Sequence, residues 1–263
     1  MRILVAILTN RFPDKLERCI DSVKKQTSDV VVVCNTLDRD FIPQSRYIAQ
    51  SSDVTFVVTE SNGTPAKGKN SVLDYFAKTD YDYLFIVDGD DSLNKDAIGT
   101  LHKVIDQSPC DVLTLVYGEQ ALVGDQQMSI LEWSTTDDYK RKFTTKKTIR
   151  NIRPLLKMRE ELYRILPYNR FLLISKKALP YFRFDEAFIG LSEYHLSIKL
   201  LHYTKDIVYK GLSANDIYVY DANDPGNYRK FMETIDGEEF IENLLQSLAE
   251  YDTSGGIDVI SVD

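Results

Sequence analysis

The chain has 263 residues, enough for one large or two small folded domains, and 43% of them are hydrophobic and 27% charged, as in ordinary globular proteins. Its formal net charge of −8 argues against a protein that coats nucleic acid, although it leaves room for a local basic patch. No stretch approaches the roughly 20 apolar residues that span a bilayer, and the first apolar run, 3–8, is shorter than the core of a signal peptide. We therefore expect a soluble, cytoplasmic protein.

The first third of the chain alternates apolar runs with amphipathic segments. Apolar runs at 3–8, 30–33 and 54–58 predict buried strands, and the apolar spacing after Pro13 predicts a helix between the first two. Strand, helix and strand at this spacing form a βαβ unit, which places the strands side by side in a parallel sheet.

The segment 60–70 after the third strand is polar and rich in small residues. It carries Lys67 and Lys69 just before a helix that we predict around 72–76. Small residues and lysines at the start of a helix can cradle an anionic phosphate, whereas a solvated loop is the simpler alternative. The residues of this segment alone leave both interpretations open.

The strand predicted at 84–87 is followed by three acids, Asp88, Asp90 and Asp91. Carboxylates this close in sequence repel each other, so a cation must lie among them or water must solvate them. Because ligands of open α/β sheets bind beyond the carboxyl ends of the strands, this strand end predicts a divalent-metal site that faces a ligand crevice. Mg²⁺ or Mn²⁺ takes oxygen ligands from carboxylates, phosphate and water, and would neutralise a leaving diphosphate.

The calcium and phosphatase alternatives for the acidic strand end fit the sequence less well. An EF-hand loop that starts at Asp88 needs glycine at its sixth position and glutamate at its twelfth, and Leu93 and Gly99 stand there. A phosphatase of the haloacid-dehalogenase type would use Asp88 as nucleophile and Ser92 as the following hydroxyl, but its motif usually lies on the first strand. An acidic turn that caps the next helix stays open as the structural alternative.

The second half of the chain continues the alternation less regularly. Helices are predicted around 97–105, 196–201 and 240–248, and strands around 112–116, 171–175, 207–210 and 217–220. The Gly- and Ser-rich residues after 251 predict a mobile tail or an appendage at the edge of the sheet.

Residues 139–159 contain nine lysines and arginines and no acid, which contrasts with the negative charge of the whole chain. Runs of like charge are usually solvated faces. The functional alternative is a patch that binds a polyanion, such as a diphosphate, an anionic glycan or nucleic acid. The candidate acceptor-binding residues within the stretch are Lys146, Lys147, Arg150 and Arg153.

Four motifs stand in a characteristic order over about residues 1–120. They are Ile-Leu-Thr-Asn-Arg at 7–11, Arg-Cys-Ile-Asp-Ser-Val at 18–23 with Gln-Thr at 26–27, Lys-Gly-Lys-Asn at 67–70, and Val-Asp-Gly-Asp-Asp at 87–91. Together they resemble the nucleotide-sugar glycosyltransferases of the GT-A fold, especially the large inverting family of bacterial and phage enzymes. The resemblance implies an α/β, Rossmann-like fold in which a mixed, mostly parallel sheet is flanked by helices. It also implies that 1–120 form the nucleotide-sugar-binding half, and 121–263 the acceptor-binding half, of one domain.

The resemblance also implies roles for residues at the expected strand ends. Asp90 would bind the metal and the diphosphate, and Asp88 would lie near the ribose or the metal, with Gly89 between them. The late third metal ligand of the family is often histidine, and Asp221 is the nearest candidate here. The residues implied to surround the donor are Thr9, Asn10 and Arg11 near the base, and Asn35, Lys69 and Asn70 along the nucleotide and sugar.

Two positions depart from the family pattern. The family often has an aspartate after the second strand that grips the base, and Asn35 stands there in this chain. Its catalytic base usually comes from a Glu-Asp pair before a late helix, and this chain has Ser192, Glu193 and Tyr194 there. We take Glu193 as the general base that deprotonates the acceptor hydroxyl, although the missing aspartate leaves the inverting mechanism open.

The sequence therefore predicts a metal-dependent glycosyltransferase, hexosyl or pentosyl, that uses Mn²⁺ or Mg²⁺ and a nucleoside-diphosphate sugar, with UDP-sugars favoured. The acceptor is a hydroxyl, and a hydroxylated base in phage DNA is one candidate, on charge and family analogy alone. Three alternatives stay open: a nucleotidyltransferase that acts on sugar phosphates, the haloacid-dehalogenase-type phosphatase, and an inactive binding module of the same fold. Residues 9–13 lack the Gly-rich basic loop that a nucleotidyltransferase needs after its first strand. The missing aspartate after Glu193, in contrast, favours the binding module.

Overall fold

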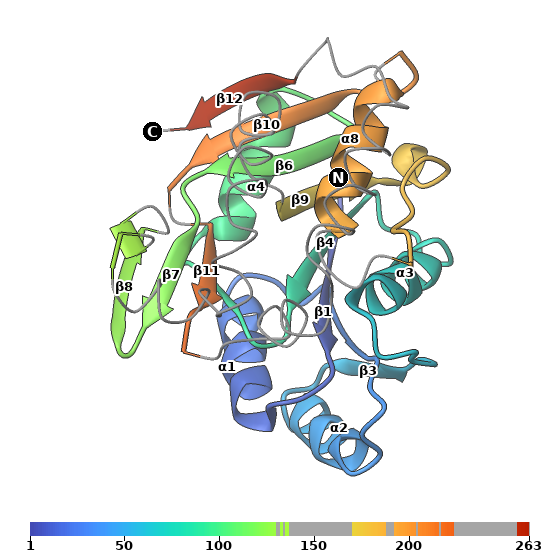
Figure 1. The fold of residues 1–263 in the computed structure, drawn as a ribbon, viewed down its shortest axis with the longest axis vertical. Coiled ribbons are helices and arrows are strands. Elements are labelled where there is room, and N and C mark those ends of the chain that lie inside the picture. Colours follow the sequence, from blue (N-terminus) through green and yellow to red (C-terminus); the bar gives the residue numbers. More distant parts are fainter. Residues whose placement is uncertain are drawn as a thin grey trace, which may run out of the picture.

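The computed structural model describes residues 1–129, 132–133, 135–136, 170–187, 192–203, 205–215, 217–223 and 257–262. Within these residues the strands form a large sheet and a small sheet beside it (Figure 1). The large sheet has the order β12 (Asp258–Val262), β10 (Tyr209–Ala214), β6 (Val112–Tyr117), β9 (Arg170–Ser175), β4 (Tyr83–Asp88), β1 (Ile3–Thr9), β2 (Val30–Cys34) and β3 (Thr55–Val58). The small sheet has the order β5 (Ser92–Leu93), β11 (Tyr218–Asp221), β7 (Gln120–Val123) and β8 (Gln126–Ser129).

The described pairs of the large sheet are parallel except those of β9, which runs antiparallel to β4 and β6. Helices cover both faces of this sheet. They are α1 (Pro13–Lys24), α2 (Phe41–Ser51), α3 (Pro65–Phe76), α4 (Ala97–Gln107) and α8 (Ser192–His202), with a short 3₁₀ turn η1 (Lys176–Ala178). The predicted α/β fold with a mixed, mostly parallel sheet is therefore confirmed.

The alternation of side chains along β1 divides the core into two layers. Ile3, Val5 and Ile7 belong to the cluster that includes apolar residues of α1, α2 and α4. Leu4 and Ala6 point to the opposite face, where they join apolar residues of α3 and α8. Because both faces are covered, β1 reads in the sequence as one unbroken apolar run rather than as an alternating one.

The strand register brings the predicted site together. Leu8 of β1 pairs with Asp88 of β4, and Thr9 of β1 pairs with Cys34 at the end of β2. Parallel strands end at the same edge of a sheet, so the loops after these three strands meet there.

Gly89 is needed at this edge because two strand ends approach each other closely. Its N–H donates to the carbonyl of Leu8 at 2.7 Å, and a Cβ on Gly89 would lie 2.8 Å from Cβ of Thr9. The chain also turns here, because the N–H of Asp91 donates to the carbonyl of Asp88 at 3.0 Å. Close packing against Thr9 thus excludes a side chain at a position where the chain turns sharply.

Several elements were absent from the predicted set. In α2 a buried serine, Ser45, stands between Phe41 and Ala49, which weakens the apolar periodicity that identifies a helix. In the small sheet, β11 corresponds to the strand predicted around 217–220, whereas β5, β7 and β8 gave too few residues for a pattern. β12 forms an edge strand where the tail was predicted to be mobile or an edge appendage, and the helix predicted at 240–248 lies outside the described residues.

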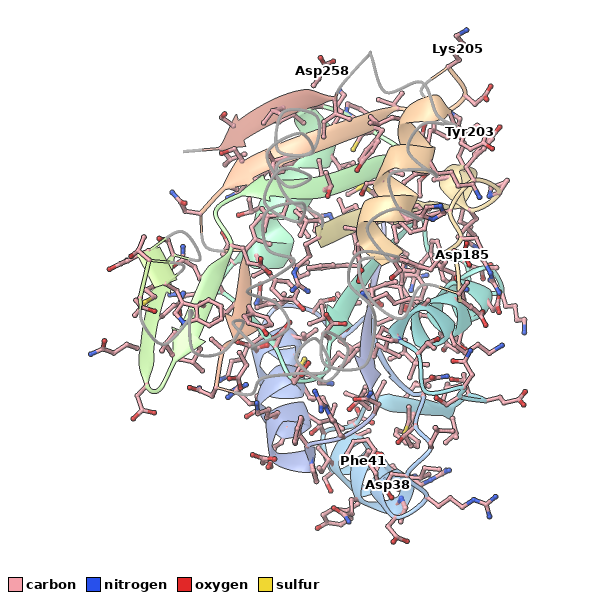
Figure 2. The ribbon with its side chains drawn as sticks, viewed as in Figure 1. Asp38, Phe41, Asp185, Tyr203, Lys205 and Asp258 are labelled. Atoms are coloured by element: carbon pink, nitrogen blue, oxygen red, sulfur yellow. The ribbon has the colours of Figure 1, made fainter. Side chains whose placement is uncertain are left out.

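The two edges of the large sheet lie far apart in the molecule. Figure 2 shows Asp38 and Phe41 near α2 at one end, and Lys205 and Asp258 at the opposite end, where β12 lies. The predicted site at β4 and β1 is thus near the middle of the sheet. In the part of the chain that the structure describes, no helix combines the length and apolar character needed to cross a membrane.

Candidate active site

A cavity of about 250 Å³ lies at the carboxyl ends of β1, β2 and β4. It collects eight of the residues predicted for the site: Thr9, Asn10, Arg11, Asn35, Lys69, Asp88, Asp90 and Glu193. They come from separate strands and helices, and the parallel register is what places them around one space.

Asp91 is the acid of the strand end that the fold itself uses. Its side chain is buried, with one oxygen accepting the hydroxyl of Tyr218 and the other the backbone N–H of Asp221, each at 2.8 Å. Asp91 therefore fastens β11 to the end of β4. This leaves Asp88 and Asp90 as the acids that can serve a ligand.

Asp90 carries a charge that its surroundings do not match. Burial raises the pKa of Asp90 and the charge of Asp88 raises it further, while its own backbone N–H, Arg11 and Lys15 offset only part of the shift. Among the described residues, no lysine or arginine forms an ion pair with this carboxylate. A carboxylate in this state is a ready ligand for a cation.

Asp88 is better compensated than Asp90. Its Oδ2 accepts a hydrogen bond from Nη1 of Arg170 at 3.1 Å. Burial raises the pKa of Asp88, but the charges of Lys69 and Arg170 outweigh burial and leave the pKa lowered. Asp88 is therefore ionised at neutral pH and lies beside Asp90 in the cavity wall.

The two acids fit a divalent ion only with help from a ligand. Among the described residues, no group of three or more histidine, cysteine, aspartate or glutamate side chains is arranged to hold a metal. Mg²⁺ in phosphate-binding sites typically takes one or two carboxylates and completes its shell with phosphate oxygens and water. Asp88 and Asp90 satisfy that requirement.

Asp221, the predicted third metal ligand, lies in an ion-pair cluster. Its Oδ2 is 2.5 Å from Nη2 of Arg18 and 3.1 Å from Nζ of Lys15, and Oδ1 accepts the N–H of Asn223 at 2.8 Å. Burial raises the pKa of Asp221, but the hydrogen bonds from Arg18, Asn223 and Lys15 outweigh it and lower the pKa. A metal would have to compete with two cations for this carboxylate.

Glu193, the predicted base, is the second residue of α8. Its Oε1 accepts a hydrogen bond from Nζ of Lys69 on α3, and its Oε2 accepts one from Oγ of Ser192 at 3.1 Å. Burial raises the pKa of Glu193, but Lys69 outweighs burial and leaves it lowered. The carboxylate is thus ionised, as a base must be, and Lys69 fixes its position.

The two predicted asparagines have different surroundings. Asn35 donates through Nδ2 to Oγ1 of Thr59 at 2.8 Å and to the carbonyl of Glu60 at 2.9 Å, so its Oδ1 is the atom left for a ligand in the cavity. Asn70 is almost fully buried and hydrogen-bonds in both directions with the backbone of Phe184. Asn70 therefore ties α3 to the chain before α8.

The predicted acceptor-binding residues are not part of this geometry. Lys146, Lys147, Arg150 and Arg153 lie outside the described residues.

Sequence reasoning missed Arg170, Glu119 and Tyr218, which surround the acids. The repulsion among the acids predicted a neighbouring cation or water, and Arg170 is such a cation. The available signal was an arginine directly before the apolar run 171–174, because a charge at the start of a buried strand needs a partner. Which acid that partner would be could not be read from the chain.

The fold and the site define an α/β protein with an acidic ligand cavity at the carboxyl ends of its strands. The model of glycosyl transferase family 2 matches residues 4–164, which is more than half of the chain. The chain therefore belongs to glycosyl transferase family 2, and the predicted nucleotide-sugar glycosyltransferase class is confirmed. No curated protein matches the sequence.

Solved structures share the fold at low sequence identity. Glucosyl-3-phosphoglycerate synthase from Mycobacterium tuberculosis, in complex with Mg²⁺ and UDP, is 14% identical with a TM-score of 0.61, over 97% of this chain and 81% of that one. S. aureus TarS 1-349 in complex with UDP-GlcNAc is 16% identical with a TM-score of 0.58, over 96% and 68%. A longer S. aureus TarS is 15% identical with a TM-score of 0.56, and the match covers 97% of this chain but only 44% of that one. These likenesses confirm the GT-A fold.

Proposed function

We propose that this glycosyltransferase takes its sugar from a nucleoside-diphosphate sugar, with UDP-sugars as the favoured donors, and that Mn²⁺ or Mg²⁺ assists the transfer. The observation that carries the proposal is that Asp88, Asp90, Lys69 and Glu193 all line the same cavity. It combines carboxylates for a cation, a lysine, and a carboxylate that can take the proton of an acceptor.

The donor is supported by the relatives and by Asn35. The related structures contain UDP-GlcNAc in one case and UDP with Mg²⁺ in the other. Because the Nδ2 hydrogens of Asn35 are used within the protein, its Oδ1 can only accept. Uracil and guanine can donate a ring N–H to such an oxygen, whereas cytosine and adenine present an acceptor there. Thr9, Asn10 and Arg11 would lie beside the base and ribose.

Asp88 and Asp90 would hold the metal together with diphosphate oxygens and water. When bound, the ion neutralises charge on the leaving diphosphate. Asp90 supports this role because its charge is unmatched in the described structure. Asp221 would become a ligand only after release from Arg18 and Lys15.

Glu193 would act as the general base on the acceptor hydroxyl. Lys69 holds its carboxylate toward the cavity, so the acceptor would approach from the side of α8. This division follows the proposed halves of the domain, with 1–120 for the donor and 121–263 for the acceptor.

The acceptor we propose is polyanionic, with a hydroxylated base in DNA as the specific candidate and Lys146, Lys147, Arg150 and Arg153 as its contacts. Charge contacts of this kind predict that acceptor affinity falls steeply as salt is added. Changing these four residues to alanine should flatten that dependence. Transfer to a neutral acceptor that does not respond to salt would contradict this part of the proposal.

Product analysis tests the central claim. The protein is incubated with Mn²⁺, a panel of UDP- and GDP-sugars, and either hydroxymethylated DNA or glycan acceptors. Free UDP together with a glycosylated product supports the proposal, whereas formation of UTP and a sugar 1-phosphate when pyrophosphate is added to the UDP-sugar would indicate nucleotidyl transfer instead. Donor binding without any turnover would indicate a binding module, which the tyrosine after Glu193 keeps as the second candidate.

A further inference from the structure

Arg170, at the start of β9, is the cation around which the acids of the cavity are arranged. Its Nε donates to Oε1 of Glu119 at 2.6 Å and its Nη1 to Oδ2 of Asp88 at 3.1 Å, while Nη2 lies 3.5 Å from Oδ2 of Asp91. Each guanidinium nitrogen therefore faces a different carboxylate. Because a guanidinium is planar and its donors form a rigid fork, three such contacts leave it a single orientation.

Tyr218 closes the remaining side of the guanidinium. The central carbon of Arg170 lies 3.7 Å from the centroid of the Tyr218 ring, close enough for a cation–π interaction. The hydroxyl of Tyr218 donates to Asp91 and accepts the backbone N–H of Asp88 at 3.1 Å. The ring, and with it the arginine, is thus fixed to the same strand end that carries the acids.

Two of the three carboxylates around Arg170 are structural. The side chains of Glu119 and Asp91 are only 7% and 3% exposed, and among the described residues Arg170 is the one cation that forms an ion pair with them. Removing a partner from buried charges of this kind is strongly destabilising. These contacts hold Arg170 in place whether or not a ligand is bound.

Asp88 differs from the other two because its side chain is 33% exposed and lines the cavity. Arg170 takes its Oδ2, whereas Oδ1 has no hydrogen-bond or ion-pair partner among the described residues. Carboxylates that ligate metals are in general themselves held by a hydrogen bond from a second group, which sets their orientation. Arg170 occupies the place of that second group.

We propose that Arg170 is a positioning residue for metal binding: it fixes Oδ2 of Asp88 so that Oδ1 is presented to a divalent cation in the cavity. The inference rests on the proposed function, because it assumes that Asp88 meets a metal. It requires the fork geometry of arginine, whereas a role in charge balance alone would be filled by any cation at position 170.

Arg170→Lys separates geometry from charge, because lysine keeps the positive charge but its donors all lie on one nitrogen and lack the planar fork that spreads the contacts of arginine over three carboxylates. The affinity for Mn²⁺ is measured from the electron paramagnetic resonance signal of the free ion, with and without UDP. Loss of a group that orients a ligand typically lowers metal affinity by about 10- to 100-fold, and we expect a loss in this range. Urea unfolding of the same samples records stability separately.

Arg183→Lys is the matched control. Arg183 makes a similar forked pair with Asp74, at 2.6 and 3.4 Å, but on the exposed surface. We expect its Mn²⁺ affinity to equal that of the wild type. If Arg170→Lys does not fold, Glu119→Gln is the second variant, since it weakens the anchor of Nε without touching Asp88, and it too should bind Mn²⁺ more weakly.

The inference would be overturned if folded Arg170→Lys bound Mn²⁺ as tightly as the wild type. The same result in Glu119→Gln would overturn it if only that variant folds. Either result would leave the proposed function standing. Failure of the wild-type protein itself to bind Mn²⁺ in the presence of UDP would instead overturn the proposed metal dependence, and the inference with it.

Discussion

Acids flank both ends of β4, but their surroundings differ. At the amino end, Asp82 accepts the exposed N–H of Arg2 at 2.7 Å, and nearby Asp111 accepts the N–H of Val208 at 2.8 Å. At the carboxyl end, Asp91 is buried against an arginine and a tyrosine, and Asp90 has no matching cation among the described residues. Of these four acids, Asp90 is therefore the one whose charge a ligand could complete.

The comparison also shows that cavity size does not identify the site. The amino end borders an open cavity of about 730 Å³, whereas the cavity at the carboxyl end holds about 250 Å³. Two of the acids that line the larger space, Asp82 and Asp111, already accept backbone N–H groups, and Asp111 also pairs with Lys177 at 2.9 Å. A charge that is partly removed from water without a matching cation is costly unless a ligand compensates it, and for this reason we propose the smaller cavity as the functional site.

The largest expected effect comes from replacing one acid at each end of β4 and comparing the two variants. Asp90→Asn should abolish metal-dependent donor binding and slow transfer by about 10²- to 10³-fold, because a bound metal contributes several kcal/mol to stabilising the leaving charge. Asp82→Asn, at the other end of the strand, should leave both unchanged. Donor titrations with and without Mn²⁺ measure the first quantity and initial rates the second. Equal effects of the two variants would refute the functional distinction between the two ends.

The second effect concerns two Lys–Glu pairs that α3 makes with the chain around α8. Glu193→Gln should slow transfer by at least about 10²-fold while the donor still binds, because a general base contributes roughly that factor. Glu186→Gln changes the other pair, in which Lys67 lies 3.9 Å from Glu186, and should leave the rate near that of wild type. Steady-state rates and a donor titration measure both variants. Full activity of Glu193→Gln would remove the base assignment without affecting the metal site.

A smaller effect, on stability, compares tyrosine hydroxyls at the two ends. Tyr218→Phe leaves buried Asp91 without its 2.8 Å donor, so we expect the free energy of unfolding to fall by about 1–3 kcal/mol. Tyr81→Phe removes a similar 2.9 Å bond to Asp29, a partly exposed acid that water can satisfy, and the loss should be below about 1 kcal/mol. Urea unfolding measures both. A larger loss of unfolding free energy for Tyr81→Phe than for Tyr218→Phe would contradict the argument that burial of the partner acid sets the cost.

The smallest effect is the pH dependence of Asp111 at the amino end. Burial raises the pKa of Asp111, but the N–H of Val208 and the Lys177 ammonium outweigh burial and lower it. Its ionised form therefore stabilises the fold above the unfolded pKa of about 3.9, and this stabilisation is lost as the pH falls through the folded pKa.

Asp111→Asn should accordingly lower the free energy of unfolding by about 1 kcal/mol at pH 7, with a smaller difference in acid below about pH 4. Urea unfolding at both pH values measures the change. A difference that does not vary with pH would contradict the lowered pKa. Asp90, whose pKa is raised, has the opposite sign: its ionisation removes stability as the pH rises above the unfolded pKa.

Much of the fold could be read from local patterns. The apolar runs of β1, β2 and β4 and the helical spacing in α1 predicted a parallel sheet, and parallel strands necessarily end at one edge. That is why the acids Asp88 and Asp90 could be placed at a ligand crevice from the sequence, while the resemblance to the GT-A family added the loop after β1 to the same site. The elements that were missed, such as α2 and the strands β5, β7 and β8 of the small sheet, are those whose apolar periodicity is interrupted or too short.

The sequence by itself determined that acids stand at the end of a buried strand and that a cation or water must compensate their negative charges. Only the tertiary structure decided which cations pair with the acids of the site. Arg170 lies 82 positions from Asp88 in the chain, and Lys69 lies 124 positions from Glu193. The physical reason is that periodicity along the chain reports which face of an element is buried. The pairing of buried charges depends on the distances that the sheet order sets between remote segments.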